Sequence, residues 1–474
     1  MQQQKQTQKP AGNDFAKKYS VHIPSHTAEI HDCTLGIPYS GDASYGLAAA
    51  FRSENINAEV MTPSCDQKTY EYADRFVTTQ TCEPFRIQTG DILSWLEIKS
   101  AQGHPPDKLA VFEPTAGGPC RFGQYAEIIR YFLNDAGYEN TRIISPSASN
   151  DYMEMQLPLL QTAKVLRLAT NALYAFDILY NALLRVRPYE KKQETANDTE
   201  YTPAENIYQQ AIAEICDDIE NGGKNLLSII KKTARNLESL EFDRSQRYPV
   251  AIINGEFFMR THPGANHNIA KVLESEFNRP LETLLAPSME WFHYVNRSRL
   301  AEAWHEKQWK DFGLGLIKKL YMDYKESRFW EPFSELLEGR EPHDPMQYVN
   351  ALEEVAAYHR DIQGESPISI GMTYLFMNHH FTPKKGAVIS GICHIGPHQC
   401  MQETVATSVS QALIRQKQAH AESPHDKIIP YVDIVFTDEP EPQWRPKLAS
   451  FVYQCYTKKD MITKNDIRSN SRKD

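Results

Sequence analysis

The stretch LAVFEPTAGGPCRFGQYAEIIRYFLNDAGYENTRIIS, residues 109–145, decides the fold. It opens with the apolar run Leu109–Phe112, turns through several Pro and Gly residues, and closes with a second apolar run at 143–145. Between the two runs, Tyr125, Ile129 and nearby apolar residues recur at the spacing of one helix face, which predicts a helix. A strand, a helix and a second strand in this order predict a parallel sheet with helices on its faces.

The same alternation continues in both directions along the chain. The expected helices lie near 43–51, 87–96 and 266–277, and the expected further strands lie at 58–61, 250–253, 387–392 and 431–436. In the middle of the chain, residues 157–184 and 204–240 are helical in pattern and contain no strand signal. We therefore predict an α/β protein of two doubly wound lobes with parallel sheets, joined by a helical segment.

The expected domain boundaries follow from these changes of pattern. They give a disordered tail at 1–20, an N-terminal α/β lobe at 21–155, a helical connector at 156–245, a C-terminal α/β lobe at 246–460 and a disordered tail at 461–474.

Composition excludes several classes of protein. The 474 residues carry a formal net charge of −10, so we expect no nucleic-acid partner. The first residues, MQQQKQTQKP, contain no apolar core of a leader peptide. The most hydrophobic long stretch, residues 165–184, contains Arg167 and Asp177, which disfavours a membrane span. We expect a cytoplasmic protein with no membrane partner.

Eight cysteines, at 33, 65, 82, 120, 216, 393, 400 and 455, stand far apart and form no CxxC pair. This spacing excludes a zinc ribbon and a thioredoxin-type dithiol. The length of the chain and the missing leader also exclude a compact disulfide scaffold. In a reducing cytoplasm, the thiols must be core residues, reactive groups or metal ligands.

Six of the cysteines are expected beside the ends of strands or the starts of helices, where ligands gather in open α/β sheets. They are Cys33, Cys65, Cys82, Cys120, Cys393 and Cys400. Cys216 and Cys455 instead fall inside helical patterns, where a thiol usually packs as a small apolar side chain.

Iron–sulfur ligation suits the first group because a helix N-terminus lowers the pKa of a thiol. Backbone N–H groups in the turn that ends at Gly118 can donate hydrogen bonds to cluster sulfurs. Arg121 can offset the charge of a cluster, although an ordinary surface position explains that arginine equally well.

Zinc is the main competitor, because CHIGPHQC at 393–400 contains two cysteines and two histidines. The usual C-x2-4-C spacing is missing there, and eight residues are a tight fit for a closed tetrahedral site. The sequence contains no phosphate-binding loop, nucleophile elbow or H-E-x-x-H motif.

Several collinear blocks resemble the 2-hydroxyglutaryl-CoA dehydratase and CoA-substrate-specific activase superfamily, in particular the dehydratase-like module at the C-terminal end of its activase-fusion proteins. GPCRFGQY at 118–125 is the most specific block, and the resemblance spans about 28 to 457. The other blocks are TCEPFRIQTGDIL at 81–93, RPYE at 187–190, NGEFFMR at 254–260 and CHIGPHQCM at 393–401.

The resemblance implies a 4Fe–4S protein with its cluster held between two α/β lobes. It implies Cys82, Cys120 and Cys400 as ligands, and a double-cubane cluster that uses six cysteines stays open. It further implies an acyl-CoA-type substrate, a separate ATP-hydrolysing activator as electron donor, and a dimer. Glu256 and Arg260 are expected either to line the cavity between the lobes and act in catalysis, or to form an interdomain ion pair.

Two departures from the resemblance concern the electron donor and the ligand set. The ATPase module of the fusion proteins is missing, and the late segment reads Cys-Met-Gln where Cys-Met-Pro is usual. The sequence thus favours an iron–sulfur component of an ATP-dependent dehydratase or reductase system in anaerobic metabolism. A non-catalytic iron–sulfur electron carrier and a zinc-dependent enzyme centred on 393–400 are the alternatives.

Overall fold

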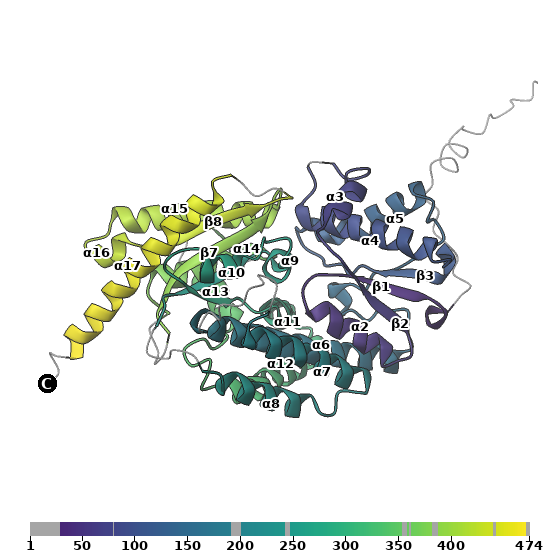
Figure 1. Cartoon of the computed structure of the whole chain (residues 1–474), viewed down its shortest axis with the longest axis horizontal. Helices are drawn as coiled ribbons and strands as arrows, with labels where there is room; N and C mark the ends of the chain where they lie inside the picture. The colour runs from purple at the N-terminus through teal and green to yellow at the C-terminus, as the bar shows by residue number, and fades with distance from the viewer. Residues whose placement is uncertain are drawn as a thin grey trace, which may run out of the picture.

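The computed structural model describes residues 29–78, 80–190, 201–241, 247–352, 358–359, 362–381, 387–438 and 442–470. The expected tail at 1–20 lies outside the described residues, whereas the last helix continues through Asn470, beyond the expected boundary near 460. Figure 1 shows two lobes side by side, with a group of helices below the place where the lobes meet.

Each lobe contains one four-stranded parallel sheet, which confirms the predicted fold class. The strand orders are β2-β1-β3-β4 and β6-β5-β7-β8, so the chain winds first to one side of the leading strand and then to the other. The strands are β1 (Thr34–Pro38), β2 (Asn57–Met61), β3 (Leu109–Phe112), β4 (Arg142–Ile144), β5 (Val250–Gly255), β6 (Glu282–Leu285), β7 (Ile389–Pro397) and β8 (Tyr431–Phe436).

Helices cover both faces of the two sheets. In the first half they are α2 (Ala43–Arg52), α3 (Gln67–Ala73), α4 (Glu83–Ala101), α5 (Tyr125–Asp135), α6 (Leu159–Val186), α7 (Pro203–Glu220) and α8 (Leu226–Glu238). In the second half they are α9 (Phe257–Thr261), α10 (Ile269–Ser275), α11 (Met289–His305), α12 (Trp309–Trp330), α13 (Pro345–Ala351), α14 (Ser366–Met377), α15 (Met401–Ala419), α16 (Pro424–Lys427) and α17 (Trp444–Asn470). Short 3₁₀ turns are η1 (Ile30–Asp32), η2 (Pro106–Lys108), η3 (Arg121–Gln124), η4 (Ala148–Asn150), η5 (Arg187–Tyr189) and η6 (Glu331–Phe333).

The apolar runs that predicted β3 and β8 match the observed strands residue for residue. Two strands, β1 and β6, carry no such run and were not predicted. The strand expected at 387–392 is β7, which begins at Ile389 and continues to Pro397. These differences change where two of the cysteines lie, as described below.

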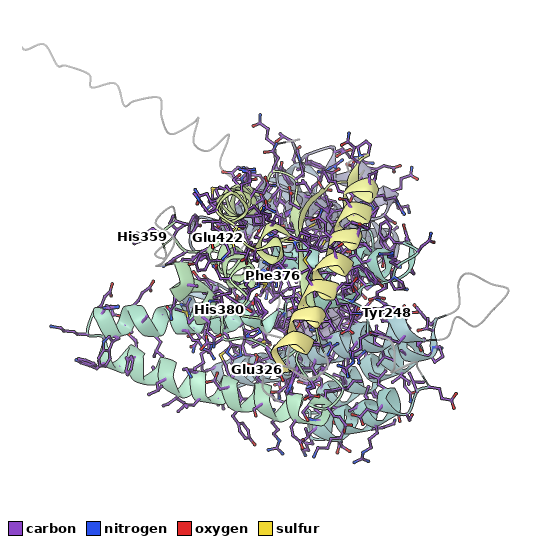
Figure 2. All side chains as sticks on the ribbon, turned by 90° about the vertical axis from the view of Figure 1, so that its left-hand side faces the viewer. Tyr248, Glu326, His359, Phe376, His380 and Glu422 are labelled. Carbon is purple, nitrogen blue, oxygen red and sulfur yellow. The ribbon has the colours of Figure 1, made fainter. Side chains whose placement is uncertain are left out.

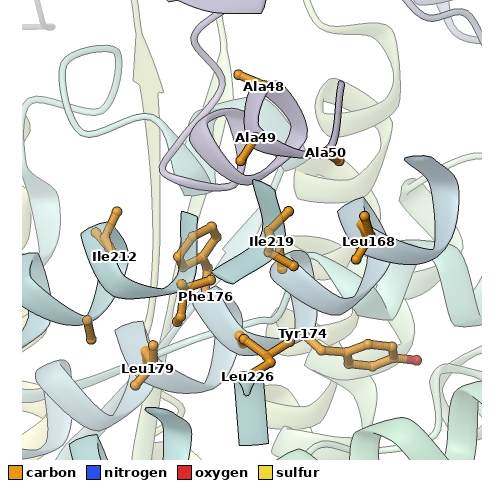
Figure 3. Close-up of a cluster of buried hydrophobic side chains, with 14 of the residues drawn as sticks. Ala48, Ala49, Ala50, Leu168, Tyr174, Phe176, Leu179, Ile212, Ile219 and Leu226 are labelled. Carbon is orange, nitrogen blue, oxygen red and sulfur yellow. The ribbon is translucent and has the colours of Figure 1, made fainter. Parts of the chain in front are cut away.

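The helical connector packs onto the first lobe and shares a hydrophobic core with it. Figure 3 shows the three alanines Ala48, Ala49 and Ala50 of α2 close to apolar side chains of α6 and α7. Small side chains on α2 let the helices approach closely, so that α6 buries Leu168 and Phe176 against it. In the described part of the chain, no helix is both long and apolar enough to cross a membrane.

Gly90 explains the Thr-Gly-Asp sequence in α4. A Cβ at this position would collide with the backbone carbonyl oxygen of Thr69 in α3. The next residue, Asp91, accepts a 2.6 Å hydrogen bond from Thr69 Oγ1 and a second one from Ser64 Oγ. These contacts hold α3 against α4, so the motif has a structural role.

Replacing a helix glycine with alanine is expected to have opposite effects on stability at Gly90 and at Gly313, because their surroundings differ. We expect Gly90→Ala to lower the free energy of unfolding by about 1–3 kcal/mol, because backbone atoms must move to admit the methyl group. We expect Gly313→Ala in α12 to raise it by up to about 1 kcal/mol, because nothing lies within 4 Å of the added atom. Urea unfolding of both variants measures the difference, and equal effects would contradict the close contact of α3 with α4.

Candidate functional site

The carboxyl edges of the two sheets face each other. In both sheets the winding reverses between the first and third strands, and ligands bind beyond the carboxyl ends of such strands. The Glu83 backbone N–H donates to the His398 carbonyl oxygen across the lobes, with the N and O atoms 3.3 Å apart. Nearby, Arg86 Nη2 lies 3.1 Å from Asp438 Oδ2. These contacts join the loops that carry the predicted ligands.

Cys82, Cys120 and Cys400 all occupy the residue immediately before a helical segment. They precede α4, η3 and α15, which come from both lobes. The backbone N–H groups of a first helical turn point toward such positions and favour negative charge there. The structure therefore gives the three cysteines the same local setting, as the sequence predicted.

Short contacts hold the two N-terminal cysteines. Cys82 Sγ lies 2.7 Å from Tyr125 Oη, and the Phe122 backbone N–H donates to Cys120 Sγ at 3.5 Å. Arg121 Nη1 donates a 2.7 Å hydrogen bond to the Gln80 carbonyl oxygen. Because Gln80 and Arg121 each lie within two residues of a site cysteine, this bond ties the two loops together.

The three thiols share an acidic environment. Burial raises the pKa of all three cysteines, to about 12 for Cys120, and the charge of Glu256 raises each pKa further. The pKa of Cys120 is raised although the residue retains an exposed surface, because protein atoms surround its sulfur. Without a bound cation, all three groups are therefore neutral thiols near pH 7. A metal ion that displaces their protons would offset this cost.

Three carboxyl groups lie in the same region. Glu256 directly follows β5 and caps α9, where it accepts from the Phe258 N–H at 3.0 Å and the Met259 N–H at 2.8 Å. Glu365 accepts from the Phe257 N–H at 2.9 Å, so it binds the same short helix. Burial raises the pKa of Glu256 and of Glu365. The charge of Glu403 raises both pKa values further, and the charge of Glu256 also raises the pKa of Glu365. Protons are thus retained beside the thiols.

Glu403, the third carboxyl group, is buried in the first turn of α15, three residues after Cys400. His394 Nε2 lies 2.8 Å from Glu403 Oε2 on the same side of β7. Sequence reasoning missed Glu365 and Glu403 as site residues, and it considered His394 only as a possible zinc ligand. Of the two missed acids, Glu403 carried a local signal, because it lies one helical turn beyond a predicted ligand.

Arg260 points away from the carboxyl groups and is buried within the C-terminal lobe. Its Nη1 atom donates to the Ala286 carbonyl oxygen at 3.0 Å and lies 3.4 Å from Glu290 Oε2. The charge of Arg260 lowers the pKa of Glu256, but burial, two backbone hydrogen bonds and the charge of Glu403 each change that pKa more. Arg260 therefore forms an ion pair inside one lobe, and not between the lobes.

Gly118 adopts a φ of +90°, a left-handed conformation that a side chain would strain. A Cβ added there would come nearest to Gln363, at 3.9 Å from its side-chain oxygen. Gln363 precedes α14 in the other lobe, so the Gly-rich turn before Cys120 lies against the opposite side of the site.

The other predicted ligands lie elsewhere. Cys65 Sγ is 3.0 Å from Tyr70 Oη in the loop after β2, where burial raises its pKa to about 11. Cys33 precedes β1, so the expectation that it lies at a carboxyl end is wrong, and its side chain is buried in the first core. Cys393 does not close its strand either; it lies inside β7 and packs in the core with Cys455.

The segment 393–400 does not gather its four polar residues at one point. Adjacent residues of a strand face opposite sides, and Cys393 packs toward Cys455 of α17 while His394 contacts Glu403 of α15. Within the described ranges, no three His, Cys, Asp or Glu side chains are close enough together to bind a single metal ion. The geometry therefore gives no support to the zinc interpretation.

Comparison of the chain with protein-family models, curated proteins and solved structures finds no match.

A small cavity of about 60 Å³ lies apart from the cysteines, between α6 and the C-terminal sheet. Its lining includes Asp177, Trp330 and Glu290. Glu290 is the acid that pairs with Arg260. The cavity lining contains no cysteine. The lining contains acids with raised pKa values, Asp177 and Glu326 among them, but offers no thiolate ligand. We therefore place the candidate site at the cysteines and the carboxyl groups beside them.

Glu113 directly follows β3 and is another group that sequence reasoning missed. Its carboxyl group is fully buried, and neither oxygen has a hydrogen-bond partner. By strand alternation it faces the same side as Leu109 and Val111, toward α4 and α5. Burial alone raises the pKa of Glu113 from 4.5 to about 8.

This raised pKa predicts a pH-dependent stability. Between pH 4.5 and about 8, folded Glu113 holds a proton that the unfolded chain has released. Rising pH therefore lowers the free energy of unfolding through this group, by up to about 1.4 kcal/mol per pH unit. Urea unfolding at several pH values measures this effect. We expect Glu113→Gln to flatten the dependence of the free energy of unfolding on pH between 4.5 and about 8. Glu154→Gln, at an exposed position, is the control and should leave that dependence unchanged. An unaltered slope in Glu113→Gln would contradict the burial of a neutral carboxyl group.

Proposed function

We propose that this chain is the iron–sulfur component of an ATP-dependent, low-potential electron-transfer system that resembles 2-hydroxyacyl-CoA dehydratases. In this proposal Cys82, Cys120 and Cys400 hold a 4Fe–4S cluster between the two lobes. The observation that carries it is the convergence of three cysteines, each at a helix start, on one acidic region from both lobes.

Three thiols supplied by loops of both lobes support a cluster over one ion in this proposal. A single metal ion with metal–sulfur bonds of about 2.3 Å needs its ligands within about 4 Å of one another. No such group exists in the part of the chain that the structure describes. A cluster binds each thiolate through a different iron, so its ligands stand farther apart. When bound, the cluster would supply one-electron transfer at low potential.

The surrounding residues have roles that do not depend on the substrate. Arg121 holds the loops of Cys82 and Cys120 together through Gln80, and Tyr125 Oη contacts the sulfur of Cys82. Glu256 and Glu365, with raised pKa values, hold protons beside the thiols. Three protein ligands leave one position open to substrate or water. These features favour an enzyme over a simple electron carrier.

Turnover with a donor tests the enzymatic part of the proposal. The anaerobically reconstituted chain would be mixed with an ATP-hydrolysing activator protein and a panel of 2-hydroxyacyl-CoA and enoyl-CoA thioesters. We expect ATP-dependent dehydration or reduction of at least one thioester. Chromatography of the acyl-CoA products measures this turnover. Reduction of the cluster without turnover across the panel would instead favour a non-catalytic electron carrier.

A further inference from the structure

A second cavity, which we call the hairpin cavity, lies at the base of the helical hairpin formed by α11 and α12. Figure 2 shows these helices projecting side by side from the body of the protein, and it labels Glu326 near the end of α12 that meets the body. The cavity encloses about 150 Å³, whereas one water needs about 10–15 Å³ of such space. Its lining is polar except for Pro287, Pro342 and Pro345. The hairpin cavity therefore has room for a small polar molecule.

His293 of α11 offers this cavity a buried hydrogen-bond acceptor. The Tyr174 hydroxyl donates to the Met322 carbonyl oxygen at 3.2 Å, so the Tyr174 oxygen accepts from His293 Nε2 at 2.9 Å. The ring proton is therefore on Nε2. Burial lowers the pKa of His293 to about 4, so the ring is neutral near pH 7. Nδ1 is left without a hydrogen-bond partner in a side chain that is only 2% exposed.

The Nδ1 atom faces the wall of the cavity that α12 supplies. It lies 3.7 Å from Oδ1 of Asp323, another lining residue, which is itself an acceptor and cannot donate to it. A buried acceptor that meets no donor carries an energetic cost until a donor reaches it. His293 therefore points to a ligand that donates a hydrogen bond.

Four acids line the hairpin cavity, and three of them are paired with cations of the same chain. The pairs are Glu290 with Arg260, Asp323 with Arg297 and Lys319, and Asp344 with Arg297. The fourth acid, Glu326, has no such partner in the described part of the chain. Its Oε1 atom lies 3.5 Å from His293 Nε2, whose proton is already bonded to Tyr174. Burial raises the pKa of Glu326 to about 7, although the charge of Arg297 lowers it.

The two groups that lack a partner, His293 Nδ1 and the Glu326 carboxylate, are both acceptors and belong to neighbouring side chains. They fit a ligand that carries a positive charge and donates hydrogen bonds. A primary ammonium group has three N–H donors and no acceptor. A directly bound metal ion does not fit, because no three His, Cys, Asp or Glu side chains of the described residues are close enough together to hold one.

The smaller cavity of about 60 Å³ adjoins the hairpin cavity and adds apolar surface. The two cavities share five lining residues, among them Glu290 and Glu326. The smaller one is also lined by Ile178 of α6, Leu285 of β6 and Met372 of α14. A short alkyl chain on a nitrogen bound at Glu326 therefore has apolar side chains next to it.

We propose that the hairpin cavity binds a small primary amine in its protonated form, with the ammonium group held by Glu326 and His293. This inference does not depend on the iron–sulfur proposal, because neither cavity is lined by a cysteine or by Glu256, Glu365 or Glu403.

Isothermal titration calorimetry of the full chain with butylammonium chloride at pH 8, where Glu326 is ionised, tests the proposal. We expect a dissociation constant on the order of 1 mM. We expect Glu326→Gln to weaken binding about 10-fold or more, because a charge-assisted hydrogen bond is lost. Asp311→Asn is the matched control, because Asp311 is an exposed acid of the same helix outside the cavity lining, and it should bind butylammonium unchanged.

Thermal unfolding gives a second measurement on the same proteins. Butylammonium should raise the unfolding temperature of the unsubstituted chain and of Asp311→Asn, and it should raise that of Glu326→Gln less. The Glu326→Gln variant is expected to fold, because the Glu326 side chain is 28% exposed and glutamine has nearly the same shape. Circular dichroism without ligand checks this.

Tetramethylammonium and potassium chloride separate a hydrogen-bonded site from general attraction of cations, because neither cation has an N–H donor. We expect no measurable binding of either at the concentrations that saturate the site with butylammonium. Three results would overturn the proposal. They are no binding of butylammonium to the unsubstituted chain, equal binding by Glu326→Gln, and binding of tetramethylammonium or potassium as tight as that of butylammonium.

Discussion

Replacing Cys120 with Ser is expected to abolish cluster assembly while the fold stays intact. A serine hydroxyl is a far weaker iron ligand than a thiolate, and two remaining thiols do not hold a cluster that needs three. The fold should persist because the residue is exposed and its sulfur accepts only a long 3.5 Å hydrogen bond from Phe122. Broad absorption near about 400 nm after anaerobic reconstitution reports the cluster.

Cys216→Ser is the matched control for this experiment. Cys216 lies inside α7, not at the start of a helix, and packs at the edge of the first core. We expect this variant to assemble the cluster as the unsubstituted chain does. If Cys120→Ser keeps full absorption near about 400 nm, then the assignment of Cys120 as a ligand is wrong.

Replacing Arg187 with Ala is expected to cause a large loss of stability. Arg187 follows α6 and is buried between two acids: Nε and Nη2 contact Glu274 at 2.6 and 3.1 Å, and Nη1 contacts Glu205 at 3.1 Å. Removing the guanidinium leaves the buried Glu274 carboxylate without the cation that it contacts, whereas Glu205 keeps Lys271 Nζ at 2.7 Å. Breaking a buried pair in this way costs about 3–5 kcal/mol.

Urea unfolding of Arg187→Ala measures this loss, with Lys232→Ala as the control. Lys232 Nζ lies 2.6 Å from Glu214 Oε1, but this pair is exposed, and such pairs contribute only about 0–1 kcal/mol. Similar losses in the two variants would contradict the structural role of Arg187. The RPYE block also holds Tyr189, whose hydroxyl donates to Glu282 at 2.8 Å, so we explain this block by packing and not by chemistry.

The sequence allowed the fold class to be predicted because apolar runs bounded by turns encode buried parallel strands. This signal is strong for β3 and β8, whose expected and observed bounds coincide. It is weak for β1, TLGIP, and β6, ETLL, because Gly, Pro, Thr or Glu interrupts their apolar residues. Missing β1 is the reason that Cys33 was expected at the wrong end of a strand.

The candidate site was predictable only where chemistry and local structure coincide. Cys82, Cys120 and Cys400 could be found because each thiol stands beside Pro, Gly or a helix start. Glu365 could not be found, because its position beside Glu256 depends on how α14 packs against α9. A carboxylate that reaches a site through tertiary packing leaves no periodic or spacing signal in the sequence.

Analysis of iron, acid-labile sulfide and zinc in the anaerobically reconstituted chain tests the central claim most directly. A 4Fe–4S cluster on Cys82, Cys120 and Cys400 predicts about four iron and about four sulfide per chain, without zinc. One zinc per chain without sulfide, or a chain that takes up no metal, would contradict it.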